Sequence, residues 1–242
     1  MHALGDHEVL AVWTSARNLH AIDRTLALLA AGCPGASRDE LAALPLGERN
    51  ARALELRERM FGTRLDGFVA CPRCAAALEL SISTRDLATV PAAELGLELE
   101  QGDYRLVLRK LDSRDLAAIA RIPDREAARA ALVDRTIASA TRAGEPIRSG
   151  ELPADVVAQV AERLAAIEPL LDTRFQLACP ACEHAWSAPF DPGAFLWHEL
   201  AARARRVMLE VHQLAQIYGW SERDVLAVPA ARRLAYLELA GG

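Results

Sequence analysis

Two Cys-Pro-x-Cys pairs, at residues 71–74 and 179–182, constrain this chain more than any other feature of its sequence. Two cysteines separated by two residues can direct both thiolates toward one point. Two such pairs supply the four tetrahedral ligands that a structural zinc ion takes, at about 2.3 Å for sulfur. Strand-like residues follow each pair, which is the local pattern of a zinc ribbon. The sequence therefore predicts a zinc ion held by Cys71, Cys74, Cys179 and Cys182.

The separation of the two pairs departs from that of a compact ribbon, in which about 15 to 20 residues lie between the two halves. Here residues 75–178 intervene. We therefore expect a discontinuous ribbon, formed by residues 63–90 and 172–192, with residues 91–171 inserted between its halves. Four thiolates leave no open position for water or substrate, so the expected role of the metal is to hold distant chain segments together.

Other interpretations of the cysteines are weaker. A thioredoxin-like redox pair requires a helix after the motif and a first cysteine of low pKa, whereas strand-like residues follow both pairs. Four unlinked buried thiols are a second alternative. The ligand set does not distinguish zinc from iron in the same cage. The fifth cysteine, Cys33, is expected to be a free thiol in a turn, and the odd count argues against a secreted disulfide scaffold.

The charge and hydropathy of the chain bound its partners. Its 242 residues are 52% hydrophobic, which is enough for a substantial core, and its net charge is −5. Nothing in that balance would draw the protein onto a phosphate backbone, so nucleic acid is disfavoured as a partner. Residues 1–12 lack the basic and apolar regions of a signal peptide, and no apolar run is long enough to span a membrane. The protein is predicted to be cytoplasmic, with no membrane partner.

Residues 1–62 are predicted to form two or three helices. Apolar residues recur at helical spacing up to Gly32, which suits a helix end. Ser37 and Glu40 form a capping-box pattern, and a run rich in Arg, Glu, Ala and Leu extends over 46–61.

The inserted segment, 91–171, changes to a mixed pattern. Alternating apolar residues on both sides of Gly102 predict a β-hairpin. Three helices are expected after it: one capped by Ser113, one from Asp124 through Ala140, and one from Pro153 to Leu171. Short strands are expected around both cysteine pairs. The predicted fold class is therefore α+β and mostly helical.

Residues 193–242 are predicted to form a separate helical docking module. One apolar face marks a long helix that ends at Gly219. Ser221 and Asp224 cap a short helix, and Pro229 separates it from the last one. The aromatic residues of this segment form a core stripe in the first instance, and they are also of the kind that protein docking sites use.

No motif of an enzyme is present. His198 and Glu199 resemble the start of a zinc-protease motif, but Ala202 stands where the second histidine is needed. The sequence has no glycine-rich phosphate loop and no nucleophile elbow. His184 follows the second cysteine pair, yet four thiolates already complete the metal shell. The chain is therefore predicted not to be an enzyme.

The C-terminal residues carry a family resemblance. It rests on Phe-Leu-Trp-His-Glu-Leu at 195–200, the arginine-rich helix after it, Tyr-Gly-Trp-Ser-Glu at 218–222, and Arg-Arg-Leu-Ala-Tyr-Leu at 232–237. These segments resemble baseplate and baseplate-hub assembly proteins of contractile phage tails and extracellular contractile injection systems. The paired cysteine motifs around a helical insert are similar to the zinc-ribbon-containing type. The resemblance is best over 195–239.

The resemblance implies metal ligation by the four cysteines and no catalytic residue. It implies partners among other baseplate, hub or tape-measure proteins, and either incorporation into a phage-tail-like particle or a role as a chaperone of hub assembly. The partner-binding residues would be Trp197, Arg203, Arg206, Tyr218, Trp220, Arg232, Arg233 and Tyr236.

A nucleic-acid-binding regulator is the alternative function. Arg203, Arg205 and Arg206 form a basic patch on the long helix, and two short helices follow it, so a helix-turn-helix arrangement is conceivable. Acidic residues such as Glu210 and Glu222 surround this patch and favour a solvated or partner-facing helix instead.

Overall fold

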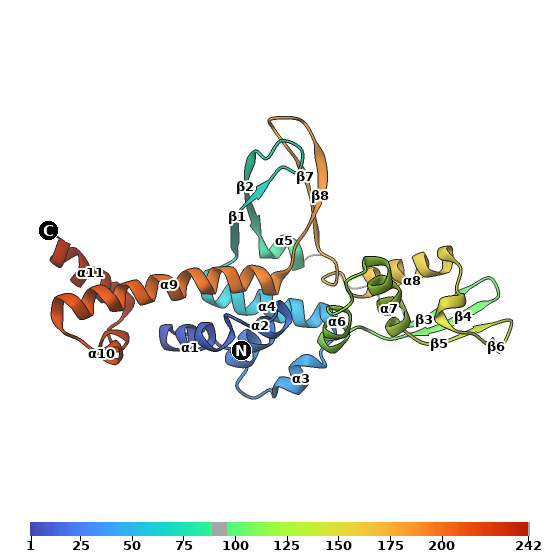
Figure 1. The fold of residues 1–242 in the computed structure, drawn as a ribbon, viewed down its shortest axis with the longest axis horizontal. Coiled ribbons are helices and arrows are strands. Elements are labelled where there is room, and N and C mark those ends of the chain that lie inside the picture. The colour runs from blue at the N-terminus through green and yellow to red at the C-terminus, as the bar shows by residue number, and fades with distance from the viewer. Residues whose placement is uncertain (89–95, 242) are drawn as a thin grey trace.

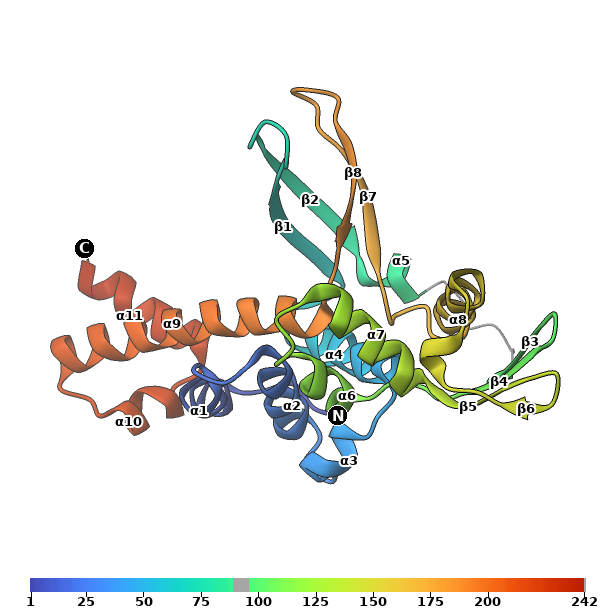
Figure 2. The same cartoon turned by 45° about the vertical axis from the view of Figure 1, so that its right-hand side comes forward.

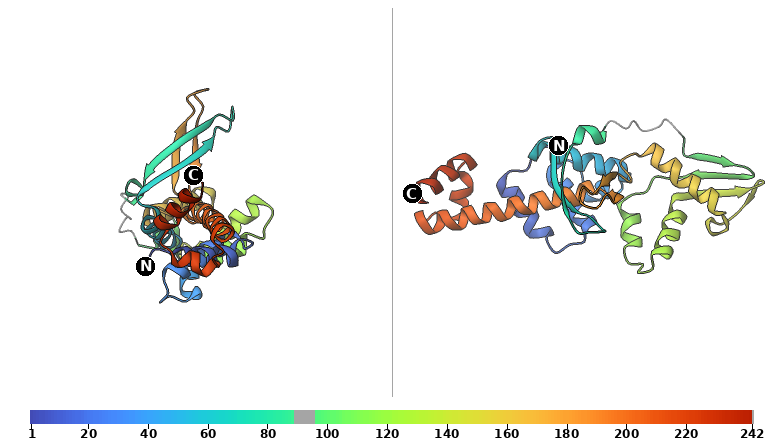
Figure 3. Two further views of the ribbon diagram at one scale, coloured as in Figure 1. Left: turned by 90° about the vertical axis from the view of Figure 1, so that its left-hand side faces the viewer. Right: turned by 90° about the horizontal axis from the view of Figure 1, so that it is seen from above.

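A long helix, α9 (Pro192–Tyr218), runs along the structure and connects its parts. The structure is a computed structural model and describes residues 1–88 and 96–241. Figure 3 shows the C-terminal helices at one end, beyond the N-terminal helices, and a small β-sheet with three helices at the other. Two β-hairpins rise from the middle on one side (Figures 1 and 2). The mixed helical and β class predicted from the sequence, with small antiparallel sheets, is confirmed.

Four helices form the N-terminal part: α1 (Asp6–Ala16), α2 (Ala21–Gly32), α3 (Arg38–Ala42) and α4 (Leu46–Phe61). The predicted helix ends at Gly32 and Phe61 are confirmed, and Ser37 accepts the Glu40 N–H in the expected capping box. The number of helices exceeds the predicted two or three, because the first apolar run is divided by a turn at residues 17–20.

The main core lies between these helices and α9. It contains Leu196, Leu200, Ala204 and Val207 of α9, packed with Leu28 of α2 and Leu56 of α4. Helix α9 approaches α2 closely at Gly193. Only glycine fits there, because a Cβ at this position would lie 2.3 Å from Thr25 Oγ1. The C-terminal segment therefore shares a core with the N-terminal helices, where the sequence alone predicted a separate module.

The C-terminal end is built as the capping pattern predicted. Gly219 ends α9 in the left-handed conformation, at φ 71°. Ser221 caps α10 (Glu222–Ala227) by accepting the Asp224 N–H, and α11 (Ala230–Gly241) begins directly after Pro229.

The inserted segment forms a four-stranded antiparallel sheet in the order β3-β4-β5-β6. The predicted hairpin is confirmed as β3 (Glu98–Gln101) and β4 (Tyr104–Leu108), joined through Gly102 at φ 57°. Helix α8 (Ala154–Ile167) packs on this sheet through Val156, Val160 and Leu164. The boundary predicted between residues 90 and 91 lies outside the described residues.

The helix predicted from Asp124 through Ala140 is wrong over its last four residues. Helix α7 (Arg125–Thr136) ends four residues earlier, and β5 (Ile137–Arg142) follows it and pairs with β4. Ala140 is buried against Leu106 and Leu108 of the sheet, so packing on a neighbouring strand overrides the helical preference of the alanines. The short β6 (Glu145–Pro146) completes the sheet.

Two smaller expectations in the insert are also corrected. Asp112, rather than Ser113, caps α6 (Ser113–Ile119), because its carboxylate accepts the N–H groups of Arg114 and Asp115. Helix α8 ends at Ile167 instead of Leu171. A short 3₁₀ helix, η1 (Ser149–Glu151), precedes α8.

Buried ion pairs join the two ends of the chain. Arg233 of α11 donates to Asp6 of α1 and, at 2.8 Å, to Glu210 of α9. Arg203 of α9 donates to the same Asp6 at 2.7 and 3.0 Å. Burial raises the pKa of Asp6, but its bonds with Arg233 and Arg203 outweigh burial and lower that pKa. These charges compensate one another away from solvent, which fixes α11 against α1 and α9.

We predict that Arg233→Met lowers the free energy of unfolding by about 3 kcal/mol, because it leaves buried carboxylates without their partner. The exposed Arg205 of α9 supplies the matched control, and Arg205→Met should change stability by less than about 0.5 kcal/mol. Urea unfolding followed by circular dichroism measures both variants. Equal stability of the two would contradict a structural role for the network.

Candidate metal centre

Two hairpins of the same design carry the cysteines. Strands β1 (Arg64–Ala70) and β2 (Ala77–Ser83) form one, and β7 (Arg174–Ala178) and β8 (Ala185–Pro189) form the other. In each hairpin an alanine pair closes the ladder before the tip, Ala70 with Ala77 and Ala178 with Ala185. Six residues form each tip, 71–76 and 179–184, so the two cysteine motifs occupy equivalent places.

The backbone of the two tips follows the same path. In the first tip, the N–H of Cys71 donates to Ala76 and the N–H of Ala75 donates back to Cys71, both at 2.9 Å. In the second, Cys179 and His184 are joined in the same way at 2.9 Å, and the N–H of Glu183 donates to Cys179 at 2.8 Å. The residue after the second cysteine is left-handed in both tips, with φ 59° at Ala75 and 57° at Glu183. In the sequence this repeat is visible as an apolar residue, an alanine, the Cys-Pro-x-Cys motif and a strand-like segment, at 69–82 and again at 177–190.

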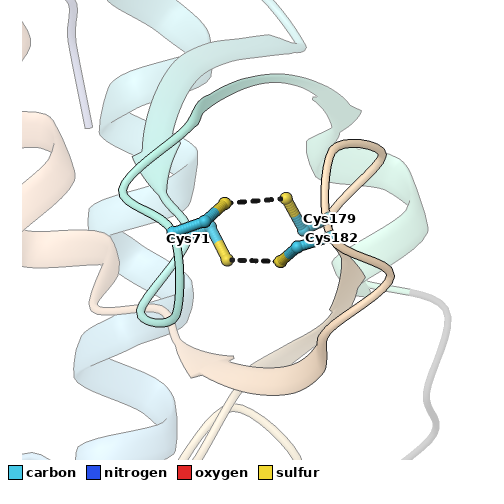
Figure 4. A group of neighbouring side chains, drawn as sticks. Cys71, Cys179 and Cys182 are labelled. Carbon is cyan, nitrogen blue, oxygen red and sulfur yellow. Dashed lines mark hydrogen bonds between the residues drawn. The ribbon is translucent and has the colours of Figure 1, made fainter.

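The two tips face each other and bring four sulfur atoms together (Figure 4). Cys71 Sγ lies 3.7 Å from Cys182 Sγ, and Cys74 Sγ lies 3.6 Å from Cys179 Sγ. All four sulfurs lie within 4.8 Å of one another. A regular tetrahedron with about 2.3 Å from metal to sulfur has edges of about 3.8 Å. The cluster therefore fits a tetrahedral metal ion, whereas a disulfide would require a sulfur separation of about 2.05 Å.

The four thiols differ in their exposure to solvent and in their pKa values. Cys71 and Cys179, the first cysteine of each tip, are buried, while Cys74 is exposed. Burial raises the pKa of Cys71, but the backbone N–H groups of Cys74 and Arg73 outweigh burial and lower that pKa to about 7. For Cys182 the His184 N–H lowers the pKa, while burial and hydrogen bonds with the other three thiols raise it to about 12.

The lowered pKa of Cys71 and the raised pKa of Cys182 bear on how the cluster would bind a metal ion. The lowered pKa of Cys71 favours a thiolate at the first tip, and the raised pKa values of Cys74 and Cys182 make further negative charge on these two thiols unfavourable without a cation. A divalent ion supplies that charge and displaces the remaining protons, so metal binding at this site is coupled to proton release. Zinc and iron both suit four thiolates, and the geometry does not distinguish them.

The His184 side chain is not among the four grouped metal-binding side chains, although its backbone N–H bonds to Cys182. Its ring stacks on Trp186 of β8, with centroids 5.9 Å apart and the planes 7° from parallel.

The eight residues predicted for partner binding are only partly brought together. Tyr218, Trp220 and Tyr236 form one aromatic cluster, with ring centroids 5.0 to 5.7 Å apart. Arg232 is exposed on α11, and Arg206 is exposed with Glu210 at 3.9 Å. Trp197 is buried in the main core under the guanidinium of Arg24, and Arg203 and Arg233 belong to the ion pairs with Asp6.

Exposed aliphatic residues at the same end of the molecule were not predicted. They are Leu209, Ile217, Leu234 and Leu239, on α9 and α11. Leu209 and Ile217 lie outside the buried stripe of α9, and Leu234 and Leu239 lie on the last helix. These positions were the sequence signal that could have identified them as exposed. Together with Tyr218, Trp220 and Tyr236 they are called here the C-terminal apolar surface.

Comparisons of the chain with protein-family models, curated proteins and solved structures found no match. Within residues 1–88 and 96–241, no helix has the length and apolar character needed to cross a membrane.

Metal analysis tests the centre directly. We predict one metal ion per chain in the purified protein, lost on Cys71→Ser or Cys179→Ser, because a hydroxyl is a poor replacement for a buried thiolate ligand. Cys33→Ser is the control and should retain the metal, since Cys33 lies outside the cluster. Inductively coupled plasma mass spectrometry gives both the stoichiometry and the element. A metal content that is equal in all three variants would remove the site.

The left-handed backbone after each second cysteine gives an independent test. Ala75→Gly should relieve the strain of a Cβ at φ 59° and raise the affinity for zinc two- to fivefold, equivalent to about 0.5 to 1 kcal/mol. Ala76→Gly, one residue further on and outside the left-handed region, should leave the affinity unchanged or lower it. Competition with a chromogenic chelator measures both constants. The same effect in both variants would show that flexibility, and not this conformation, controls binding.

Proposed function

We propose that this protein is a non-enzymatic interaction component of a contractile phage-tail-like injection machine, either a baseplate subunit or a chaperone of hub assembly. In this proposal the two cysteine hairpins form a discontinuous zinc ribbon around the inserted segment. Its partners are baseplate, hub or tape-measure proteins.

One observation carries the proposal: the C-terminal apolar surface. Leu239 is 76% exposed and Leu234 50% exposed on α11, the helix that contributes Tyr236 to the aromatic cluster with Tyr218 and Trp220. Exposed apolar side chains and aromatic rings are typical of surfaces that bind another protein. The surface includes the segments on which the resemblance to baseplate and hub-assembly proteins rests.

The metal centre supports a structural part of the same proposal. Four thiolates would complete a tetrahedral shell and leave no position for substrate, so the metal would stabilise the hairpins without catalysing a reaction. Two-stranded hairpins are marginally stable by themselves, and structural zinc contributes about 10 to 16 kcal/mol of apparent binding energy in small domains.

The regulator alternative loses part of its basis in the structure. Of the three arginines in the predicted basic patch, Arg203 is held in an ion pair with Asp6. Arg205 and Arg206 are both exposed, and Glu210, 3.9 Å from Arg206, partly offsets the charge of Arg206. Such a surface offers little attraction to a phosphate backbone.

Quantitative mass spectrometry of contractile particles from the native host, compared with the cleared lysate, tests the proposal. A fixed low copy number relative to sheath and tube would identify a baseplate subunit. Absence from particles together with co-purification of hub subunits would identify a chaperone. Absence of both associations, with salt-dependent binding to duplex DNA, would overturn the proposal in favour of the regulator.

A matched pair of variants locates the interaction. Leu239→Glu is predicted to abolish association with the particle or hub, because it places a charge in the C-terminal apolar surface. Phe68→Glu is the control, since Phe68 is also 76% exposed but lies on β1 of the first hairpin. The co-purified amount of each variant is the readout. Equal loss in both, or in neither, would exclude the C-terminal apolar surface as the docking site.

A further inference from the structure

A second site lies at the opposite end of the molecule, where the insert meets α4. A cavity of about 490 Å³ opens between α7 and α8, above the first turns of α4. Most of its wall is apolar and includes Leu116, Leu132, Val133, Val157 and Leu164. Its volume is in the range of sites that bind small organic ligands.

One wall of this cavity contains Arg49, a buried arginine without an ion-pair partner among the described residues. Three arginines are buried among the described residues: Arg57 is 3% exposed, Arg233 is 2% exposed and Arg49 is 5% exposed. Arg57 forms a two-pronged ion pair with Glu199, and Arg233 is paired with Asp6 and Glu210. Arg49 has no ion-pair partner within the described residues. Buried charges normally have such a partner, so Arg49 is the exception in this fold.

The hydrogen bonds of Arg49 leave part of its guanidinium available. Its Nε and Nη2 atoms donate to Asn50 Oδ1 at 3.2 and 2.9 Å, and Asn50 Nδ2 donates to the Leu170 carbonyl at 2.7 Å. Its Nη1 atom makes no hydrogen bond within the described residues. Burial lowers the pKa of Arg49 more than the charge of Asp191 raises it. The Asp191 carboxylate itself is used to cap α9, where it accepts the N–H groups of Gly193 and Ala194.

We propose that this cavity binds a small molecule with an apolar chain and a single carboxylate, with the carboxylate at Arg49 and the chain along the apolar walls. A guanidinium binds a carboxylate with matching geometry, and the ligand would supply the charge that Arg49 lacks. Asp172 and Asp191 also line the cavity and equal in number its two arginines, Arg49 and Arg129, so a second negative charge on the ligand would meet no excess of cations there. The site therefore favours a monoanion such as a fatty acid over a phosphate. This inference does not depend on the proposed function.

Dodecanoate is the probe, with dodecanol as its uncharged counterpart. We expect dodecanoate to bind the full-length protein with a stoichiometry of one, measured by isothermal titration calorimetry, and at least tenfold more tightly than dodecanol. Arg49→Met should remove that preference, and Arg49→Lys should restore part of it. Thermal melting of each variant without ligand verifies that it is folded. No binding of dodecanoate, or the same preference in Arg49→Met, would overturn the proposal.

Two exposed alanines of α8 test where the apolar chain of the ligand lies, without altering the buried Arg49. Ala165 lines the cavity, whereas Ala158 on the same helix does not. Ala165→Phe should block binding of dodecanoate, and Ala158→Phe should leave it unchanged. Equal affinity of the two variants would place the ligand elsewhere. Protection of this cavity by a protein partner in hydrogen exchange, with no dodecanoate binding, would make it a protein-docking groove and the proposal wrong.

Discussion

The contact between α4 and α9 determines where the two cysteine hairpins begin and end, because β1 follows α4 and β8 precedes α9. The Arg57 guanidinium joins the two helices through both oxygens of Glu199, at 2.8 and 2.7 Å, and also donates to the Gly62 carbonyl at the end of α4. Strand β1 begins two residues after Gly62, and β8 ends three residues before α9 begins its first turn. One buried ion pair thus sets the bases of both hairpins side by side, and their tips then bring together cysteines that are 105 and 111 positions apart.

A metal bound at the tips would close a long loop that the helical core leaves open. The loop-closure entropy rises only slowly with length, so an insert of this size between the hairpins is tolerated thermodynamically. Near the base of the second hairpin, Phe175 of β7, Phe190 after β8 and Phe195 of α9 cluster, with neighbouring ring centroids 5.1 and 5.6 Å apart, and they line one pocket together with Leu65 and Leu80 of the first hairpin. At the tips the four sulfur atoms bring the two hairpins together. A four-thiolate shell around a metal would join the hairpins there and would leave no open position for a substrate.

Local signals in the sequence were read correctly where one segment decides its own structure. The helix end at Gly32, the hairpin around Gly102 and the cap at Ser221 all depend on residue spacing and turn chemistry. The convergence of the cysteine motifs is the exception, because the shared ligand chemistry of the four thiols signals it across more than 100 residues. The errors arose where distant residues decide. Ile137–Arg142 is a strand because β4 lies beside it, and Arg233 is buried because Asp6, at the other end of the chain, receives it. No spacing rule connects such residues, and the same holds for the solitary Arg49.

The cysteine hairpins, the C-terminal helices α10 and α11, and the helices α7 and α8 that line the Arg49 cavity occupy different places on the molecule (Figures 1 and 3). The cavity wall includes Phe190 and Asp191, which connect β8 to α9, and α9 leads to the C-terminal apolar surface at its other end. A partner bound at the C-terminal apolar surface would therefore leave the cavity uncovered. A ligand at Arg49 would instead place its carboxylate near Asp191, the cap of α9, whose charge already acts on Arg49. The two interactions are thus sterically independent, and any coupling between them has to pass through α9.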